Sequence, residues 1–290
     1  MITYNGIIMA MDGIWIGPKI DPYNPLDLPP NTIRCKYATG YTPTAGTTQT
    51  LIDVEENIWD IYVSSNNWED VLRLQELTSV LGANTSNVTN MHNLFSGCRR
   101  LSNVALFDTR NVSDMRSMFY NCNSLTTIPQ FDTSNVTSFG GMFDFCAALT
   151  EIPLLNTSNG TDFSSMFGSC PRLTSVPLLD TSKATNTGGM FEYCYALAQA
   201  PSFDLSKVTN ARYMFERCES LTTVPLYNIP RVTDTTRMFG QCFNVQSGAL
   251  ALYNQIANQG ISQHSQMFYE CGSHTTTGAA ELAQIPDDWK

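Results

Sequence analysis

Apolar residues recur along most of the chain at a fixed interval of 24 residues. Each interval holds a Met-Phe pair (Leu-Phe in the first), a cysteine three residues after the phenylalanine, and a leucine or valine three residues later. The cysteines that mark the interval are Cys98, Cys122, Cys146, Cys170, Cys194, Cys218 and Cys242. A period of this length is typical of a solenoid, in which one supersecondary unit stacks on the next.

The apolar spacing within one unit predicts a helical turn followed by a strand. Four residues of the third copy fall at i, i+1, i+4 and i+7, namely Met142, Phe143, Cys146 and Leu149. This spacing places them on one face of a short helical turn. Leu149 and Ile152 then enter a short extended segment, which a proline follows. Coils about 4.8 Å apart would bury a continuous core, so we expect an α/β repeat, a right-handed solenoid of short strands and short helical turns.

The repeat divides the chain into four regions. Residues 1–30 are expected to form an N-terminal arm and linker, and residues 31–70 a small β module with an N-terminal cap. Residues 71–246 form the solenoid of about seven full coils, and residues 247–290 a C-terminal cap with an inserted helix. Atypical, capped ends are what a solenoid requires.

Local patterns add detail at both ends. At the N-terminal end, alternation over Asn31–Tyr37 and Thr50–Val54 predicts a hairpin. Asn67 is placed to cap a helix that runs from Trp68 toward Leu77.

In the C-terminal region, Ser247–Gln259 is predicted to be the inserted helix. Leu282–Pro286 is predicted to be a last copy of the strand.

The repeat signature M-F-x-x-C-x-x-L-T-x-x-P-x-F-D-T-S-N-V-T resembles the BspA-like leucine-rich repeats of bacterial surface proteins. Similar repeats occur in mycoplasma lipoproteins and in gut-bacterial and phage genomes. The resemblance covers roughly Val71 to Trp289 and excludes the first 30 residues. It implies a leucine-rich-repeat solenoid with a role in adhesion or recognition and without catalysis, and it carries no functional residues.

Composition narrows the classes of partner. The net charge of −10 argues against nucleic acid, because no basic patch is available to neutralise phosphate. Charged residues make up only 14% of the chain, so threonine, serine and asparagine supply the polar surface. No stretch approaches the roughly 18–20 apolar residues that a membrane span needs.

The N-terminal segment bears on localisation and partners. It lacks the basic start and uninterrupted apolar run of a signal peptide. A bacterial surface adhesin needs such a signal, whereas a phage virion protein does not, so we expect a virion protein. The apolar residues of the candidate docking arm are Ile7, Ile8, Ile14, Trp15 and Ile16. This arm would bind other virion or surface proteins, or would fold back over the first coil as a cap.

The regular cysteines could form disulfides, a metal site or a packing column. Equivalent side chains on successive coils point the same way, whereas a disulfide needs converging Cβ vectors. The spacing also differs from paired Cys-x-x-Cys zinc ligands. We interpret the cysteines as small buried apolar residues.

An aspartate column raises the question of calcium. Its acidic members are Asp108, Asp132, Asp180 and Asp204, and Asn156 and Asn228 interrupt it. Stacked carboxylates could ligate calcium. Free exchange of Asp for Asn favours Asx turns instead, in which the side chain bonds to the backbone two residues on.

The sequence gives no support for catalysis or a cofactor, since the three histidines lack a regular relation to any nucleophile or carboxylate pair.

The variable positions between the core columns are where recognition is expected. Aromatic residues at these positions form a candidate ligand-binding edge: Tyr120, Phe145, Tyr193, Tyr195, Tyr213 and Phe243. Exposed aromatics on a rigid scaffold suit sugar stacking or a protein hot spot. The alternatives are sequence drift on a solvated face and lateral packing between neighbouring solenoids, which allows a homo-oligomer.

These observations predict a non-enzymatic recognition or structural protein without cofactors. The leading hypothesis is a phage fibre or decoration component that binds a glycan or protein receptor on the host surface. A bacterial cell-surface adhesin and a glycan-binding accessory module are the alternatives.

Overall fold

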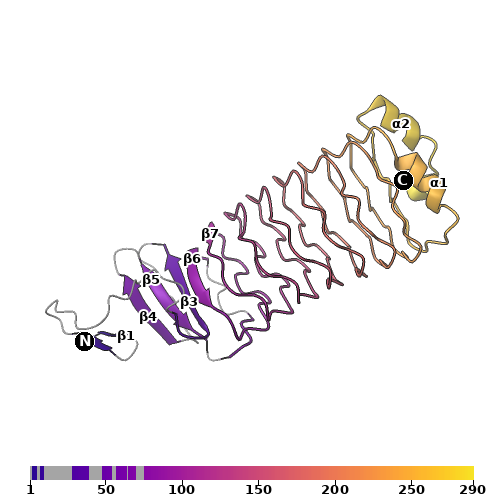
Figure 1. Cartoon of the computed structure of the whole chain (residues 1–290). Coiled ribbons are helices and arrows are strands. Elements are labelled where there is room, and N and C mark those ends of the chain that lie inside the picture. The colour runs from indigo at the N-terminus through magenta and orange to yellow at the C-terminus, as the bar shows by residue number, and fades with distance from the viewer. Residues whose placement is uncertain are drawn as a thin grey trace.

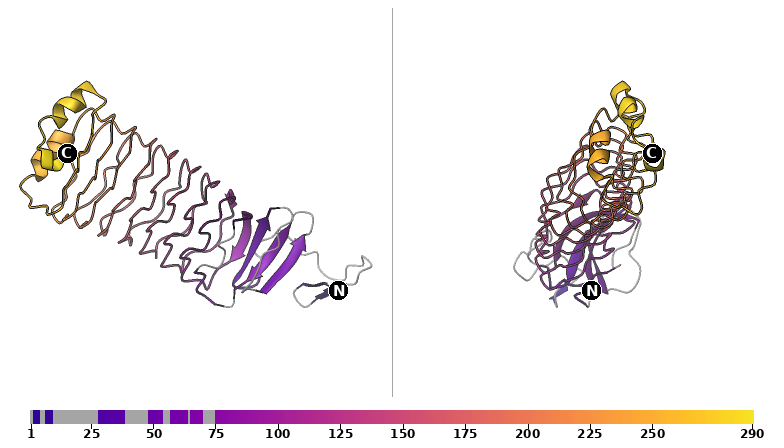
Figure 2. Two further views of the ribbon diagram at one scale, coloured as in Figure 1. Left: turned by 180° about the vertical axis from the view of Figure 1, so that it is seen from behind. Right: turned by 90° about the vertical axis from the view of Figure 1, so that its right-hand side faces the viewer.

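The computed structural model is an elongated solenoid with a β-sheet at its N-terminal end and two helices at its C-terminal end (Figure 1). The structure describes residues 2–4, 7–9, 28–38, 48–53, 57–63, 65–69 and 75–290. Two further views show the coils stacked along one axis (Figure 2). The prediction of a repeat fold is confirmed.

The N-terminal β-sheet contains five strands in the order β4-β5-β3-β6-β7. Their bounds are Thr32–Tyr37 (β3), Thr48–Asp53 (β4), Ile58–Tyr62 (β5), Leu77–Asn84 (β6) and Asn103–Val104 (β7). The predicted hairpin between β3 and β4 is wrong, because β5 lies between them and pairs antiparallel with both. A separate antiparallel pair, β1 (Ile2–Tyr4) with β2 (Ile7–Met9), precedes this sheet.

Strand β6 joins the sheet to the solenoid. It pairs antiparallel with β3 on one side and parallel with β7, in the first coil, on the other. The predicted helix from Trp68 is absent where the chain is described: Asn67 Oδ1 accepts the N–H of Glu69 at 3.1 Å in an Asx turn, and Asn67 bridges to Asn90. Residues 70–74 of that expected helix lie outside the described residues.

Each coil is held to the next by alternate backbone amides. In the third coil, four amides donate to carbonyls about one coil further on: Phe139 to Asp162, Gly141 to Ser164, Phe143 to Met166 and Phe145 to Gly168, all at 2.7–2.9 Å. The amides between them donate three residues back within the same coil, as Met142 does to Phe139 at 3.1 Å. From Phe139 to Cys146, every backbone amide except that of Gly140 is therefore bonded.

This alternation of hydrogen bonds between and within coils explains why the predicted helical turn does not form. The residues at two places in each coil, four positions apart, have positive φ, such as Gly141 at 62° and Phe145 at 61°. A left-handed residue at every fourth position turns the following amide outward to the neighbouring coil, and so prevents a continuous helix. The strands are also reduced, mostly to single parallel bridges between coils.

The core consists of parallel columns of identical side chains. From Phe95 to Phe239, the phenylalanine rings of successive coils stack with centroids 5.3–5.8 Å apart and nearly parallel planes. The methionine, cysteine and leucine columns beside them are fully buried. Stacking of coils therefore supplies the apolar burial that no single coil could provide.

The cysteine column packs in this core and also donates hydrogen bonds. Cys146 Sγ lies 3.1 Å from the carbonyl oxygen of Phe119 in the preceding coil, and the contact repeats at 3.0–3.2 Å from Cys122 to Cys242. All nine cysteines are buried, and none forms a disulfide. Burial raises the pKa of the Cys146 thiol to about 12, so it stays protonated and able to donate.

Threonine and Asx side chains hold the opposite bend of the coil. Thr133 Oγ1 donates to the carbonyl of Asn156 in the next coil at 2.8 Å. The Asx-turn interpretation is confirmed: Asp132 Oδ1 accepts the N–H of Ser134 at 3.0 Å, and Asn156 Oδ1 accepts that of Ser158 at 3.2 Å. These bonds lower the pKa values of Asp132, Asp180 and Asp204, first through the serine hydroxyl and then through its N–H.

The C-terminal end departs from the repeat. Helix α1 (Ala249–Ile256) forms within the predicted segment, and the next bridge joins Asp234 to Gln263 rather than to a residue 24 positions on. The predicted last strand is wrong, because helix α2 (Thr276–Leu282) and a 3-10 helix (Asp287–Trp289) occupy this region. The carbonyl of Trp289 accepts the amide of Phe268 at 2.8 Å and so takes the place of a further coil.

We expect the nine thiols to be unreactive in the folded protein, because burial both shields the sulfur atoms and disfavours thiolate. A thiol-reactive chromogenic reagent should titrate almost no thiol in native buffer and nine per chain in denaturant without reductant. Fewer than nine in denaturant would indicate disulfides, and rapid reaction in native buffer would show that the column is accessible.

Candidate interaction surfaces

A row of exposed leucines runs along the solenoid, which the sequence reasoning missed. The row, called the leucine ridge here, consists of one residue from each of six successive coils: Leu106, Gln130, Leu154, Leu178, Ser202 and Leu226. Its four leucines are 58–65% exposed, whereas the leucines of the core column are fully buried. The signal for the ridge in the sequence was the leucine at the position directly after the proline column. This leucine looks like a core leucine in the sequence.

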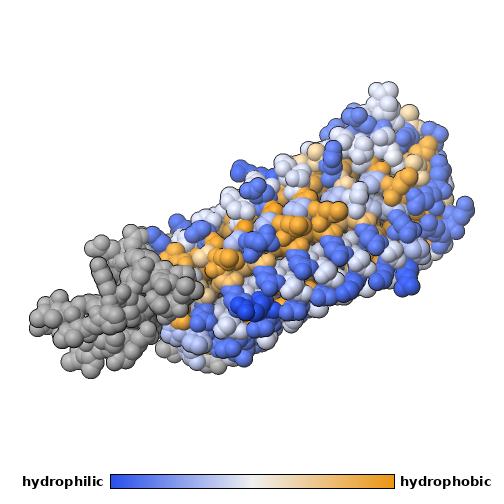
Figure 3. Space-filling model, viewed as in Figure 1, coloured by the Kyte–Doolittle hydropathy of each residue, from blue (hydrophilic) through white to orange (hydrophobic). Residues whose placement is uncertain are grey.

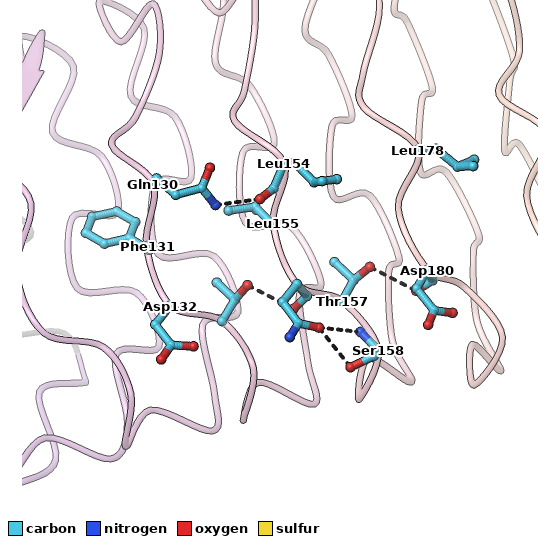
Figure 4. Close-up of a pocket in the computed structure, with 11 residues that line it drawn as sticks. Gln130, Phe131, Asp132, Leu154, Leu155, Thr157, Ser158, Leu178 and Asp180 are labelled. Carbon is cyan, nitrogen blue, oxygen red and sulfur yellow. Dashed lines mark hydrogen bonds between the residues drawn. The ribbon is translucent and has the colours of Figure 1, made fainter.

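The leucine ridge borders a shallow hollow of about 560 Å³. Gln130, Leu154 and Leu178 line one side on successive coils, and Asp132 and Asp180 line the other (Figure 4). Asn156 also lines the hollow. Gln130 Nε2 donates to the carbonyl of Leu154 and so lies along the ridge. The space-filling view shows apolar surface continuing along this face of the solenoid (Figure 3). The half-buried proline column, beside the leucines in the sequence, extends the apolar character of the ridge.

The predicted aromatic edge forms two separate ring clusters. Tyr120 packs edge-on against Phe145, with ring centroids 5.6 Å apart. Tyr193 packs edge-on against Tyr195 at 6.2 Å, and the guanidinium of Arg217 lies 5.8 Å from the Tyr193 ring.

Exposure differs among the rings of this edge. Phe145 is 47% and Tyr195 39% exposed, whereas the other four predicted edge residues are partly buried.

The remaining two predicted edge residues have other partners. Phe243 stacks on His274 with centroids 4.6 Å apart. Tyr213 lies beneath the guanidinium of Arg212, which is 4.6 Å from its ring centroid. In the described part of the chain, neither Phe243 nor Tyr213 makes a ring contact with either of the two ring clusters.

Three of the edge residues occupy left-handed backbone. Phe145, Tyr193 and Tyr213 have φ values of 61°, 60° and 59°. Other coils place glycine at the same two positions, as at Gly97 and Gly189, or a polar residue that ranges in size from Ser169 to Arg217. Bulky side chains at positive φ carry a backbone cost of about 1 kcal/mol or more, and such residues concentrate at functional sites.

In three coils an acidic side chain lies between the two left-handed positions. These residues are Asp144, Glu192 and Glu216, and Gly168 takes the equivalent place between the first two. A Cβ atom at Gly168 would lie 2.6 Å from Asp144 Oδ1, so glycine makes room for this carboxyl group. Glu216 pairs with Arg237 at 2.9 Å.

Among the described residues, Asp144 has no comparable counter-charge. Burial, and then the charge of Glu192, raises its pKa to about 7.

The described residues do not bring together three histidine, cysteine or acidic side chains in a way that could hold a metal ion. The aspartate column therefore remains explained by its Asx turns. Within the same part of the chain, no helix combines the length and apolarity needed to cross a membrane.

The predicted docking arm is largely outside the described residues. Ile7 and Ile8 lie in β2, and nothing is described of their side chains. Ile14, Trp15 and Ile16 lie outside the described residues. Docking by the arm stays a prediction.

Comparison with known proteins places the chain among repeat proteins. A family model described as "Mycoplasma protein of unknown function, DUF285" matches residues 68–178, 150–250 and 173–279, which together span well over half of the chain. The match supports the resemblance to BspA-like repeat proteins at the level of the repeat family. No curated protein matches the chain.

One solved structure of low similarity is a leucine-rich-repeat protein of T. pallidum. It is 22% identical, with a TM-score of 0.38, and the match covers 47% of this chain and 62% of that one.

The raised pKa of Asp144 predicts a pH-dependent stability. Because its folded pKa lies above that of an exposed aspartate, its contribution to stability is full below about pH 4 and is lost as the pH rises through about 7. Asp144→Asn removes the buried charge. We expect equal melting temperatures for the variant and the wild type at about pH 4, and a variant higher by a few degrees at about pH 8.

Asp132→Asn is the matched control. The pKa of Asp132 is lowered, so its charged form stabilises the fold and the substitution should not raise the melting temperature at high pH. An Asp144→Asn variant with the same pH profile as the wild type would show that the carboxyl group is solvated in the folded protein.

Proposed function

Because the chain belongs to the repeat family described as Mycoplasma protein of unknown function, DUF285, we propose that it is a non-enzymatic recognition protein. Its solenoid is the rigid scaffold, and its aromatic edge is the surface that binds a partner. Surface and protein-interaction roles are typical of such leucine-rich-repeat families. The partner is a protein or glycan on a cell surface.

The observation that carries this proposal is the left-handed backbone beneath Phe145 and Tyr193. The scaffold does not require an aromatic ring at this position, since other coils place glycine or a polar residue there, as Gly97, Asn121 and Arg217 show. Aromatic side chains there work against local backbone preference, and contact of the rings with a partner would offset this cost. Aromatic rings held by a rigid backbone lose little entropy on binding, and they stack on sugars or fill protein hot spots.

The histidines support recognition rather than catalysis. His92 pairs with Glu69 at 3.0 Å, His264 stacks on Trp289 and His274 stacks on Phe243. A general base needs a nucleophile within hydrogen-bond reach. Among the described residues, each histidine ring is instead engaged with an exposed carboxylate or an aromatic ring.

The finer proposal is a phage fibre or decoration component, located in the virion, that mediates host-surface binding. The resemblance to repeats in phage genomes supports it. A bacterial cell-surface adhesin is the alternative, supported by the mycoplasma description of the family, and a glycan-binding accessory module is the third. Neighbouring genes discriminate them: portal or tail genes favour the virion, and genes for export or for a catalytic partner favour the others.

Attachment through the N-terminal arm completes the proposal. An apolar arm followed by a proline-rich linker suits docking on other virion or surface proteins, while the solenoid projects outward. The arm's described strands, β1 and β2, lie at the end of the molecule that carries the sheet, opposite the C-terminal helices (Figure 1).

The aromatic edge is tested by replacing Tyr193 and Tyr195 together with asparagine. Asparagine tolerates the left-handed backbone, so the melting temperature should stay level or rise slightly while binding falls at least tenfold. Binding is measured on an array of bacterial cell-wall and capsular glycans and on a panel of intact bacterial cells.

Tyr62→Asn is the control, because Tyr62 is 43% exposed but lies in β5, away from the edge. Binding by the wild type that survives the double substitution would refute the edge as the binding surface. Loss of binding in the Tyr62 variant as well would show that the effect of the double substitution is not specific to the aromatic edge.

A further inference from the structure

The leucine ridge has an order of apolar and polar positions that reads the same from either end. Leucines occupy its two ends and its centre, and Gln130 and Ser202 occupy the second and fifth places. We propose that the ridge binds the same ridge of a second copy of this chain, antiparallel, about a two-fold axis between Leu154 and Leu178. This inference concerns a different surface from the aromatic edge and does not rest on the proposed function.

A two-fold axis at this place brings like against like. Leu154 meets the partner's Leu178, Leu106 meets the partner's Leu226, and Gln130 meets the partner's Ser202. Self-complementary contact of this kind is the definition of an isologous dimer interface. The two solenoids also have the same coil spacing, so the pairs stay in register over the ridge, about 24 Å at a strand spacing of about 4.8 Å.

The ridge is apolar enough to favour burial. Its leucines are 58–65% exposed in the single chain. Contiguous apolar patches on soluble proteins mark interaction sites, whereas singly scattered leucines do not. The next place in the column is Leu250, within α1, so the ridge ends at Leu226.

The polar column beside the ridge fits the same axis. Under the two-fold operation, Asn156 faces the partner's Asp180, and Asp108 faces the partner's Asn228. Asn156 Oδ1 is used in its own Asx turn, and its amide nitrogen has no partner among the described residues, so it is free to donate to a carboxylate.

One like-charge pair remains beside the ridge, Asp132 with the partner's Asp204. Hydrogen bonds from Ser206, and to a smaller extent the positive charge of Lys207, lower the pKa of Asp204, and the Lys207 charge reduces the repulsion.

The size of the contact sets its strength. Six coils with a narrow apolar band bury less than the roughly 800 Å² per partner of a standard stable interface. We therefore expect a dimer with a dissociation constant in the micromolar range, which increases local valency when chains are concentrated on one particle or surface.

Sedimentation velocity of the full chain over a concentration series tests the dimer. The wild type should shift from monomer to dimer across the micromolar range, and Leu154→Glu should raise the dissociation constant at least tenfold without a change in melting temperature, because the side chain is exposed. Tyr62→Glu, at an exposed aromatic off the ridge, should leave the dimer intact. A wild type that stays monomeric throughout, or a dimer unaffected by Leu154→Glu, would overturn the proposal.

Disulfide trapping tests the orientation, since the native thiols are buried and leave only introduced cysteines to react. Antiparallel ridges place Gln130 opposite the partner's Ser202. A mixture of Gln130→Cys chains with Ser202→Cys chains should therefore oxidise to the mixed dimer, and neither variant should cross-link alone. Efficient cross-linking of Ser202→Cys with itself would overturn the antiparallel arrangement.

Discussion

The structure depends on one constraint: every second amide of the Met-Phe stretch donates to a carbonyl of the next coil. The pattern works only if equivalent residues recur at the same spacing, because each donor in one coil needs its acceptor at the same height in the next. A buried amide without a partner costs more than the bond itself contributes. The backbone therefore enforces the 24-residue register, and the side-chain columns follow from it.

Each column of side chains has its own structural role. Phenylalanine, methionine and leucine supply apolar burial, and the cysteine thiol adds a weak donor to a carbonyl that already accepts one amide. Positions between the columns do not have these roles, but the 24-residue register still aligns them in straight rows along the solenoid. A leucine or a tyrosine at such a position therefore contributes to a ridge or an edge, and the solenoid turns small local variation into an extended surface.

Much of the scaffold could be predicted from the sequence, because periodicity reports burial directly. The cysteine spacing gave the coils, and the exchange of Asp132 for Asn156 gave the Asx turns. The helical turn was mispredicted because its spacing of apolar residues is also that of a helix, and only the left-handed φ of residues such as Phe145 distinguishes the two. The leucine ridge was missed because Leu154 and its neighbour Leu155 look alike in the sequence, although one is exposed and the other buried. The predicted hairpin failed because a central strand, β5, follows β4 in the chain.

The dependence of the fold on register is tested most directly by removing one coil. Deleting Gly141–Ser164 removes 24 residues and joins two equivalent positions, so every donor regains an acceptor. Deleting Gly141–Phe163 leaves one extra residue inside the Met-Phe stretch and shifts the alternation of its amides. Calorimetry should show cooperative unfolding near the wild-type melting temperature for the first deletion and a melting temperature lower by many degrees, or no transition, for the second. Similar melting temperatures for the two deletions would contradict this account.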